Sequence, residues 1–213
     1  ALKLRELEER NRELANQVKR LVQVERDMYT VQELLDEQVR IYRSLNETVQ
    51  RLHSIRNIAE ILNTAARFVV YELNFERCVL LHRAAGDAEY SICASDGYFD
   101  DDALRRVSSL RVPDAFIGGV FHESPFYVLS DRKDSTLMDL CDALGMDEWV
   151  LHILPSESLP YSYLLVSGNS KERFASQSRV IPNNVTMVGL GSLVSQISST
   201  LYNAYSYQTI ATE

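Results

Sequence analysis

The spacing of the three cysteines decides most directly which kinds of chemical site this chain could form. Cys78, Cys93 and Cys141 lie far apart, and no C-x-x-C pair occurs. Zinc sites use closely spaced thiolates, and disulfide frameworks use paired cysteines in extracellular chains. The spacing therefore indicates neither kind of site. Free, buried thiols in a reducing compartment are the expected state.

Four aspartates lie close together in the sequence and could act as ligands: Asp96, Asp100, Asp101 and Asp102. Carboxylate oxygens of this kind can hold a hard cation. They also suit the positive N-terminus of a helix, where each stabilises by about 0.3–1 kcal/mol. Because the cluster directly precedes a segment with a helical pattern, we expect a helix N-terminus and no metal site.

The remaining candidates stand alone. His82, His122 and His152 have no partner motif, and a lone histidine is usually structural. Gly189-x-Gly191 lacks the Gly-Lys-Ser or Gly-Lys-Thr of a phosphate loop, so it is expected to let two helices approach closely. No motif joins a nucleophile, a base and an orienting group. The sequence therefore predicts that the chain is not an enzyme.

The stretch that organises the chain is its N-terminal part, residues 1–52, which contains neither Gly nor Pro. Apolar residues recur there every seven positions in two interleaved series, a spacing that keeps a narrow stripe facing a partner helix. A polar residue at one core position, Asn11, favours two parallel strands in register. We therefore predict a parallel homodimer with this interface: Leu7, Asn11, Leu14, Val18, Leu21, Val24, Met28, Val31, Leu35 and Leu45. The heptad phase slips near Leu21 and Leu52.

After residue 57 the pattern changes. Asn57, followed by Glu60, predicts an N-cap and a helix over 57–73. Runs of β-favouring residues bounded by turn residues then predict strands over 77–84, 89–95, 126–130, 148–155 and 161–168. Helices are predicted over 100–110, over 135–144 and from Asn183 or Asn184 to the end, with a loop over 111–125. Gly145 is expected to end the second of these helices. The fold class is α+β with an antiparallel sheet.

Composition limits the partners. The chain has 213 residues and a net charge of −8. Residues 1–56 carry eleven Lys and Arg against ten Asp and Glu, and the remainder carries eleven against twenty. An acidic globule argues against nucleic-acid binding. No run of about 18 apolar residues and no signal peptide is present, so we expect a cytoplasmic protein without a membrane segment. Because the chain begins without Met, we expect a piece of a longer protein, fused to an output domain.

Residues 46–205 resemble a GAF domain, and PAS is the second choice. The segments that carry the resemblance are Tyr71 to Leu81, Ser95-Asp-Gly-Tyr98, Val128-Leu-Ser-Asp131, and Tyr163 to Gly168 ahead of Arg173-Phe174. The resemblance implies an antiparallel sheet with helices on one face and a ligand pocket on the other. It divides the chain into a coiled-coil helix (1–52), a GAF-like domain (53–183) and a C-terminal helix (184–213).

Chemistries known among GAF domains can be compared residue by residue. Bilin-binding members carry Cys-His, but Cys141 is followed by Asp142. Cyclic-nucleotide-binding members have an acidic pair where Ser178 and Arg179 stand, although Asn169, Lys171 and Phe174 match. The three cysteines do not match the set of methionine-sulfoxide-reducing members. The cofactor therefore stays unknown.

The resemblance implies a regulatory sensor module, as in bacterial sensor histidine kinases, nucleotide cyclases and diguanylate cyclases. A small-molecule signal would pass through coiled-coil helices to the output domain, as in two-component systems. The expected pocket residues are Tyr90, Cys93, Tyr98, Phe116, Tyr127 and His152. The alternative is a ligand-free module for dimerisation or protein docking, in which the same residues are packing residues.

Overall fold

The computed structural model describes all residues except 1, 122, 131–136, 156–158, 173–175 and 213. Two compact units are present, Ala1–Arg40 and Ile41–Glu213. The first unit consists of the greater part of helix α1 (Leu2–Ser54). The second unit contains the last turns of α1 and every other helix and strand.

Helix α1 confirms the predicted N-terminal helix and is continuous through both heptad slips. It ends at Ser54, two residues after the predicted end of the coiled-coil helix at residue 52. Helix α2 (Ile58–Tyr71) follows, and the Asn57 side chain caps it by accepting a hydrogen bond from the Glu60 backbone N–H at 3.3 Å. The compact second unit begins at Ile41, earlier than the predicted domain boundary at residue 53. The reason is that the last turns of α1 pack into the core of that unit.

In the described part of the chain, six antiparallel strands form one sheet in the order β3-β2-β1-β6-β5-β4. Their bounds are β1 (Arg77–Ala84), β2 (Glu89–Asp96), β3 (Arg111–Pro113), β4 (Phe126–Val128), β5 (Glu148–Ile153) and β6 (Tyr161–Asn169). The predicted strands are thus present. The hairpin from β1 to β2 turns at Gly86, whose φ of 94° requires the left-handed region that glycine tolerates.

The segment predicted as a loop, 111–125, instead contains strand β3 and helix α4 (Asp114–Val120). Both are short, and the helix contains Gly118 and Gly119, so neither has enough periodic residues to be detected from the sequence. Pro113 ends the strand and precedes the helix, consistent with its fixed φ.

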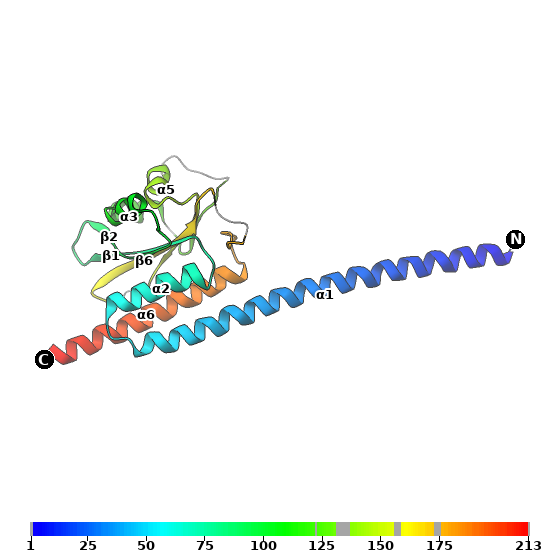
Figure 1. Cartoon of the computed structure of the whole chain (residues 1–213), viewed down its shortest axis with the longest axis horizontal. Coiled ribbons are helices and arrows are strands. Elements are labelled where there is room, and N and C mark those ends of the chain that lie inside the picture. Colours follow the sequence, from blue (N-terminus) through cyan, green and yellow to red (C-terminus); the bar gives the residue numbers. More distant parts are fainter. Residues whose placement is uncertain (1, 122, 131–136, 156–158, 173–175, 213) are drawn as a thin grey trace. The chain divides into compact units, whose positions relative to one another are not determined.

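Helices lie on both faces of the sheet (Figure 1). On one face, which we call the helix face, the last turns of α1 pack with α2 and with α6 (Val185–Thr212). On the other face, which we call the site face, lie α3 (Asp101–Ser108), α4 and α5 (Met138–Leu144). Each face has its own buried apolar cluster, and alternate residues of β1, β5 and β6 belong to the two clusters in turn. The antiparallel α+β fold is confirmed, with short helices on the site face in addition to the long ones.

The predicted helix ends are formed by the predicted residues. Asp100 caps α3 by accepting a hydrogen bond from the Ala103 N–H at 2.9 Å, and Gly145 ends α5 with φ of 63°. Asn184 accepts from the Met187 N–H at 2.8 Å at the start of α6. Within the described part of the chain, no group of three or more His, Cys, Asp and Glu side chains could hold a metal ion.

Candidate functional site

The six predicted pocket residues divide between the two faces of the sheet. Tyr90, Tyr98 and Phe116 belong to the site-face cluster or pack against it. Cys93 and Tyr127 pack against the helix-face cluster, and His152 alternates in β5 with the site-face residues Trp149 and Leu151, so it also lies on the helix face. These residues therefore cannot line one cavity, because the sheet separates them. His122, Asp131, Arg173 and Phe174 lie outside the described residues.

Aromatic rings fill the centre of the site face. Phe121 stacks edge-on against Phe116, Phe126 and Trp149, with centroids 5.9, 4.8 and 6.1 Å away. Edge-to-face contacts at these distances are favourable packing. The Trp149 indole is fully buried, and its Nε1–H donates to the sulfur of Cys141 at 3.2 Å. Among the described residues, side chains of the chain itself therefore occupy the middle of the face where the resemblance implies a ligand.

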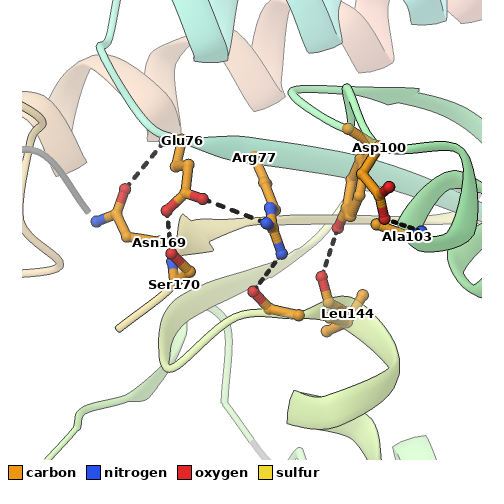
Figure 2. A network of polar contacts seen from close by, with 9 residues as sticks. Glu76, Arg77, Asp100, Ala103, Leu144, Asn169 and Ser170 are labelled. Atoms are coloured by element: carbon orange, nitrogen blue, oxygen red, sulfur yellow. Dashed lines mark hydrogen bonds and ion pairs between the residues drawn. The ribbon is translucent and has the colours of Figure 1, made fainter. Parts of the chain in front are cut away.

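A polar network lies where strand β1 begins and strand β6 ends (Figure 2). Arg77, at the start of β1, pairs with Glu76 at 3.3 Å and donates to the carbonyl of Gly145, which ends α5. Its guanidinium also lies 5.2 Å from the centroid of the Tyr98 ring. The Tyr98 hydroxyl donates to the carbonyl of Leu144 at 2.8 Å, and burial raises the pKa of that hydroxyl. Arg77 and Tyr98 thus hold the end of α5 against the sheet.

The network continues toward α6 through Asn169, which is fully buried. Its Oδ1 accepts from the Glu76 N–H at 3.0 Å, and its Nδ2 donates to Glu148 Oε1 and to the Ser178 carbonyl, both at 2.8 Å. Glu76 in turn accepts from the Ser170 N–H at 2.7 Å. The sequence had pointed to Asn169 only through a cyclic-nucleotide motif. Two features of the sequence indicate this structural role. Asn169 ends a buried strand, and acidic residues stand where β1 and β5 begin.

The helix face is built for close packing between helices. A Cβ atom placed on Gly189 of α6 would lie 2.6 Å from Cγ2 of Ile41 in α1, so only glycine permits this approach. The Ser44 hydroxyl of α1 donates to Glu72, after α2, at 2.7 Å. At the other end of α6, the hydroxyls of Tyr163 and Tyr205 are 2.6 Å apart and join strand β6 to the helix. The predicted role of Gly189 is confirmed, whereas Gly191 faces open space.

Burial favours the neutral forms of three side chains on the helix face: His152, Cys93 and Cys78. Burial lowers the pKa of His152 to about 4, and its Nε2 has no hydrogen-bond partner among the described residues. Burial also raises the pKa of the Cys93 thiol to about 12 and raises that of Cys78. Thiols with raised pKa values are poor nucleophiles, because the thiolate is the reactive form.

Most of the predicted interface residues are exposed in the single chain. Leu7, Leu14, Leu21 and Leu35 are each at least 57% exposed, and the other predicted members in the first unit are exposed too. Leu45 is the exception and corrects the prediction, because it is buried in the helix-face cluster of its own chain. The heptad spacing continues through Leu45, but the Leu45 side chain faces the core of the second unit of its own chain.

No protein-family model and no curated protein matches the chain. Its fold matches solved structures at low sequence identity. The GAF domain of a phosphoenolpyruvate-protein phosphotransferase from Coxiella burnetii has a TM-score of 0.57 at 15% identity over 81% of this chain and 98% of its own. A methyl-accepting chemotaxis protein, residues 122 to 287, has a TM-score of 0.56 at 15% identity over 76% and 98%. The phycocyanobilin-bound GAF domain of a cyanobacterial phytochrome has a TM-score of 0.57 at 13% identity over 78% and 95%. The chain therefore has the fold of a GAF domain.

Proposed function

We propose that the chain is a regulatory sensor and dimerisation module of a bacterial signal-transduction protein, without catalytic activity of its own. It would form a parallel homodimer through α1 and act in the cytoplasm on an output domain fused to it. No described helix is long and apolar enough to cross a membrane.

The observation that carries the proposal is the exposed apolar stripe of the first unit. A single helix cannot bury such a stripe, and each large apolar side chain brought out of water contributes about 1.5–3 kcal/mol. Leu4, Leu7, Leu14, Val18, Leu21, Val24, Met28, Val31 and Leu35 are all more than half exposed. A partner helix of the same length and period, which a second copy supplies, would cover all of them.

Charges beside the stripe favour a parallel arrangement in register. In a parallel coiled coil, the residue that directly precedes the first core position of a heptad lies opposite the residue five positions later in the partner helix. This rule places Lys3 opposite Glu8 of the second copy and Arg20 opposite Glu25, so both pairs attract. It also places the exposed Leu34 opposite Val39, which widens the apolar seam. None of these three pairs brings like charges together.

A route for the signal is the continuity of α1. The same helix carries the exposed seam and, from Ile41 onward, packs into the core beside α6. A change in how the two seams pack would therefore be felt where Ile41 lies against Gly189 of α6. Packed helices have few discrete arrangements, so a ligand or partner need favour one by only about 1–3 kcal/mol to switch them.

A second candidate function is a ligand-free module for dimerisation or protein docking. The aromatic cluster of Phe116, Phe121, Phe126 and Trp149 favours it, because these rings occupy the centre of the site face. The neighbour that binds phycocyanobilin keeps a chromophore in a GAF domain. If the chain acts as a sensor, its ligand would have to bind beside these rings or displace them.

Two measurements test the proposal. Sedimentation equilibrium of the full chain should give a dimer mass at micromolar concentrations, and a monomer would overturn the proposal. Purified protein should then be denatured and its supernatant examined by mass spectrometry for a released small molecule. A stoichiometric compound supports the sensor, whereas a dimer that releases nothing and shows no thermal shift across a panel of nucleotides and metabolites supports the ligand-free module.

A further inference from the structure

A small pocket lies where α1 ends, the chain turns into α2, and α6 passes alongside (Figure 1). We call it the turn pocket, and its volume is about 180 Å³. The three helices around it pack on the helix face, so the turn pocket is separate from the aromatic cluster of the site face. Its polar lining residues are His53, Ser54 and Arg56 of the turn, and Thr200, Asn203 and Tyr207 of α6.

The two segments that line the turn pocket contain no carboxylate. Residues 48–59, around the turn, include Arg51, His53 and Arg56 but neither Asp nor Glu. Helix α6 contains no Asp, Glu, Lys, Arg or His in its 28 residues. The net charge of the chain is −8, so a pocket with basic side chains and no acidic ones is a local exception. Such an uncompensated positive region attracts anions.

Arg56 and His53 supply donors that the chain itself does not use. Within the described part of the chain, neither side chain pairs with a carboxylate. The guanidinium of Arg56 lies over the Tyr207 ring, 5.5 Å from its centroid. A guanidinium that stacks on a ring keeps the N–H groups at its edge available, and this planar fork matches the oxygens of a phosphate or carboxylate. Tyr207 thus positions Arg56 without using its donors.

The carbonyl groups at the end of α1 do not oppose an anion as strongly as those of an open helix end. The carbonyl of Arg51 accepts a hydrogen bond from the Ser54 hydroxyl at 2.6 Å, and that of Leu52 accepts from the Ile55 N–H at 3.0 Å. Free carbonyls at a helix C-terminus carry partial negative charge, which these two bonds reduce. The basic side chains therefore dominate the electrostatics of the turn pocket.

Size and charge together select a small anion. Pockets for drug-sized ligands measure about 300–1,000 Å³, so the turn pocket suits a single phosphoryl group and not a nucleotide. A neighbouring groove between α1 and α2 is larger, at about 540 Å³, but it combines Arg51 and Arg67 with Glu60 and Glu72. The charges of that groove offset each other, so it favours no anion.

We propose that the turn pocket binds a phosphoryl group, either inorganic phosphate or the phosphate of a small monoester. The guanidinium of Arg56 would donate to two of its oxygens, and the side chains of His53 and Asn203 would donate to the others. A carboxylate has only two oxygens and cannot use all of these donors at once. The bound group would join the turn between α1 and α2 to α6. This inference goes beyond the proposed function, because it requires neither the dimer nor a ligand on the site face.

The test is isothermal titration calorimetry of the full chain with inorganic phosphate, at a constant ionic strength of about 0.15 M. One phosphate should bind per chain, with a dissociation constant of about 1 mM for so small and exposed an ion. Arg56→Gln should raise that constant at least about tenfold, because charge-assisted hydrogen bonds are lost. Arg67→Gln removes the same charge from an exposed position of α2 outside the pocket and is the matched control. It should change the constant by less than about twofold.

Further probes distinguish the possible ligands. Glycerol phosphate that binds more tightly than inorganic phosphate identifies a monoester as the ligand, and weaker or equal binding identifies free phosphate. Acetate that binds as tightly as phosphate would overturn the phosphoryl assignment. No saturable binding of phosphate, or equal losses in Arg56→Gln and Arg67→Gln, would overturn the site itself. Sedimentation measures the dimer separately, so a failure of this inference and a failure of the proposed function are distinguishable.

Discussion

Gly189 of α6 lies directly against Ile41 of α1, so that a methyl group on Gly189 would stand 2.6 Å from Cγ2 of Ile41. Ile41 is the first residue of the compact second unit and is almost completely buried. The contact therefore marks the point where the N-terminal helix enters the globular core. It joins this helix to the C-terminal one, the two elements of the proposed route for a signal.

Replacing Gly189 tests this contact. In Gly189→Ala the added methyl must displace Ile41, and overpacking of a buried site costs about 1–3 kcal/mol. The gain in helix propensity of about 1 kcal/mol offsets part of that cost. Gly191→Ala is the matched control, because nothing lies within 4 Å of its added methyl. Urea unfolding should show Gly191→Ala as the more stable variant by at least about 1 kcal/mol, and equal stabilities would contradict the close packing.

Breaking the seam of α1 should dissociate the dimer. Leu14 is 57% exposed in the single chain and would be buried twice in the dimer. With about 1.5–3 kcal/mol for each buried leucine, Leu14→Glu should raise the dissociation constant more than a hundredfold. Asn16→Glu adds the same charge on the opposite side of the helix and should leave the dissociation constant unchanged. Sedimentation velocity over a concentration series distinguishes the two, and similar behaviour of both variants would argue against the seam.

Asn11 should set the number and register of the strands. A polar residue at a core position costs stability but is tolerated best opposite its own copy. We expect Asn11→Ile to raise the melting temperature and to add species larger than a dimer. Calorimetry and multi-angle light scattering measure both effects. A clean dimer of unchanged stability would show that Asn11 is not in the seam.

The buried His152 predicts a loss of stability in mild acid. Its pKa of about 4 in the folded chain lies below the ordinary value of 6.5. As pH falls, the His152 ring therefore binds a proton in the unfolded chain before it does so in the folded chain. The stability that the neutral ring provides is complete above pH 6.5 and is lost as pH falls toward 4. Each pKa unit corresponds to about 1.4 kcal/mol, so the loss is at most about 3 kcal/mol. Urea unfolding at several pH values should show this slope, and His152→Leu should remove it. The lowered pKa of the less buried His82 acts in the same direction and would leave a smaller slope.

Local patterns predicted the strands and helix caps well, because β-branched runs, Asn57, Asp100 and Gly145 act through neighbouring residues. The pocket was predicted poorly. Tyr90 and Cys93 are three residues apart on one strand, so simple alternation already places them on opposite faces. The filling of the site face by Phe116, Phe121, Phe126 and Trp149 depends on contacts between distant segments. The same holds for the burial of Leu45, since its heptad position cannot show which neighbour covers it.

Asn169 offers a last test, because it connects the end of the sheet to the segment that leads into α6. Asn169→Ala would remove one acceptor and two donor hydrogens from the buried Glu148 carboxylate and from two half-buried groups, the Glu76 N–H and the Ser178 carbonyl. Buried groups left without hydrogen bonds cost about 1–3 kcal/mol each, so we expect a loss of at least about 2 kcal/mol in the free energy of unfolding. Ser170→Ala keeps the backbone N–H that donates to Glu76 and should stay within about 0.5 kcal/mol of the unsubstituted chain. Urea unfolding compares the two variants. If they were equally stable, the network would be a surface feature that water replaces, and it could not hold the start of α6 in place relative to the site face.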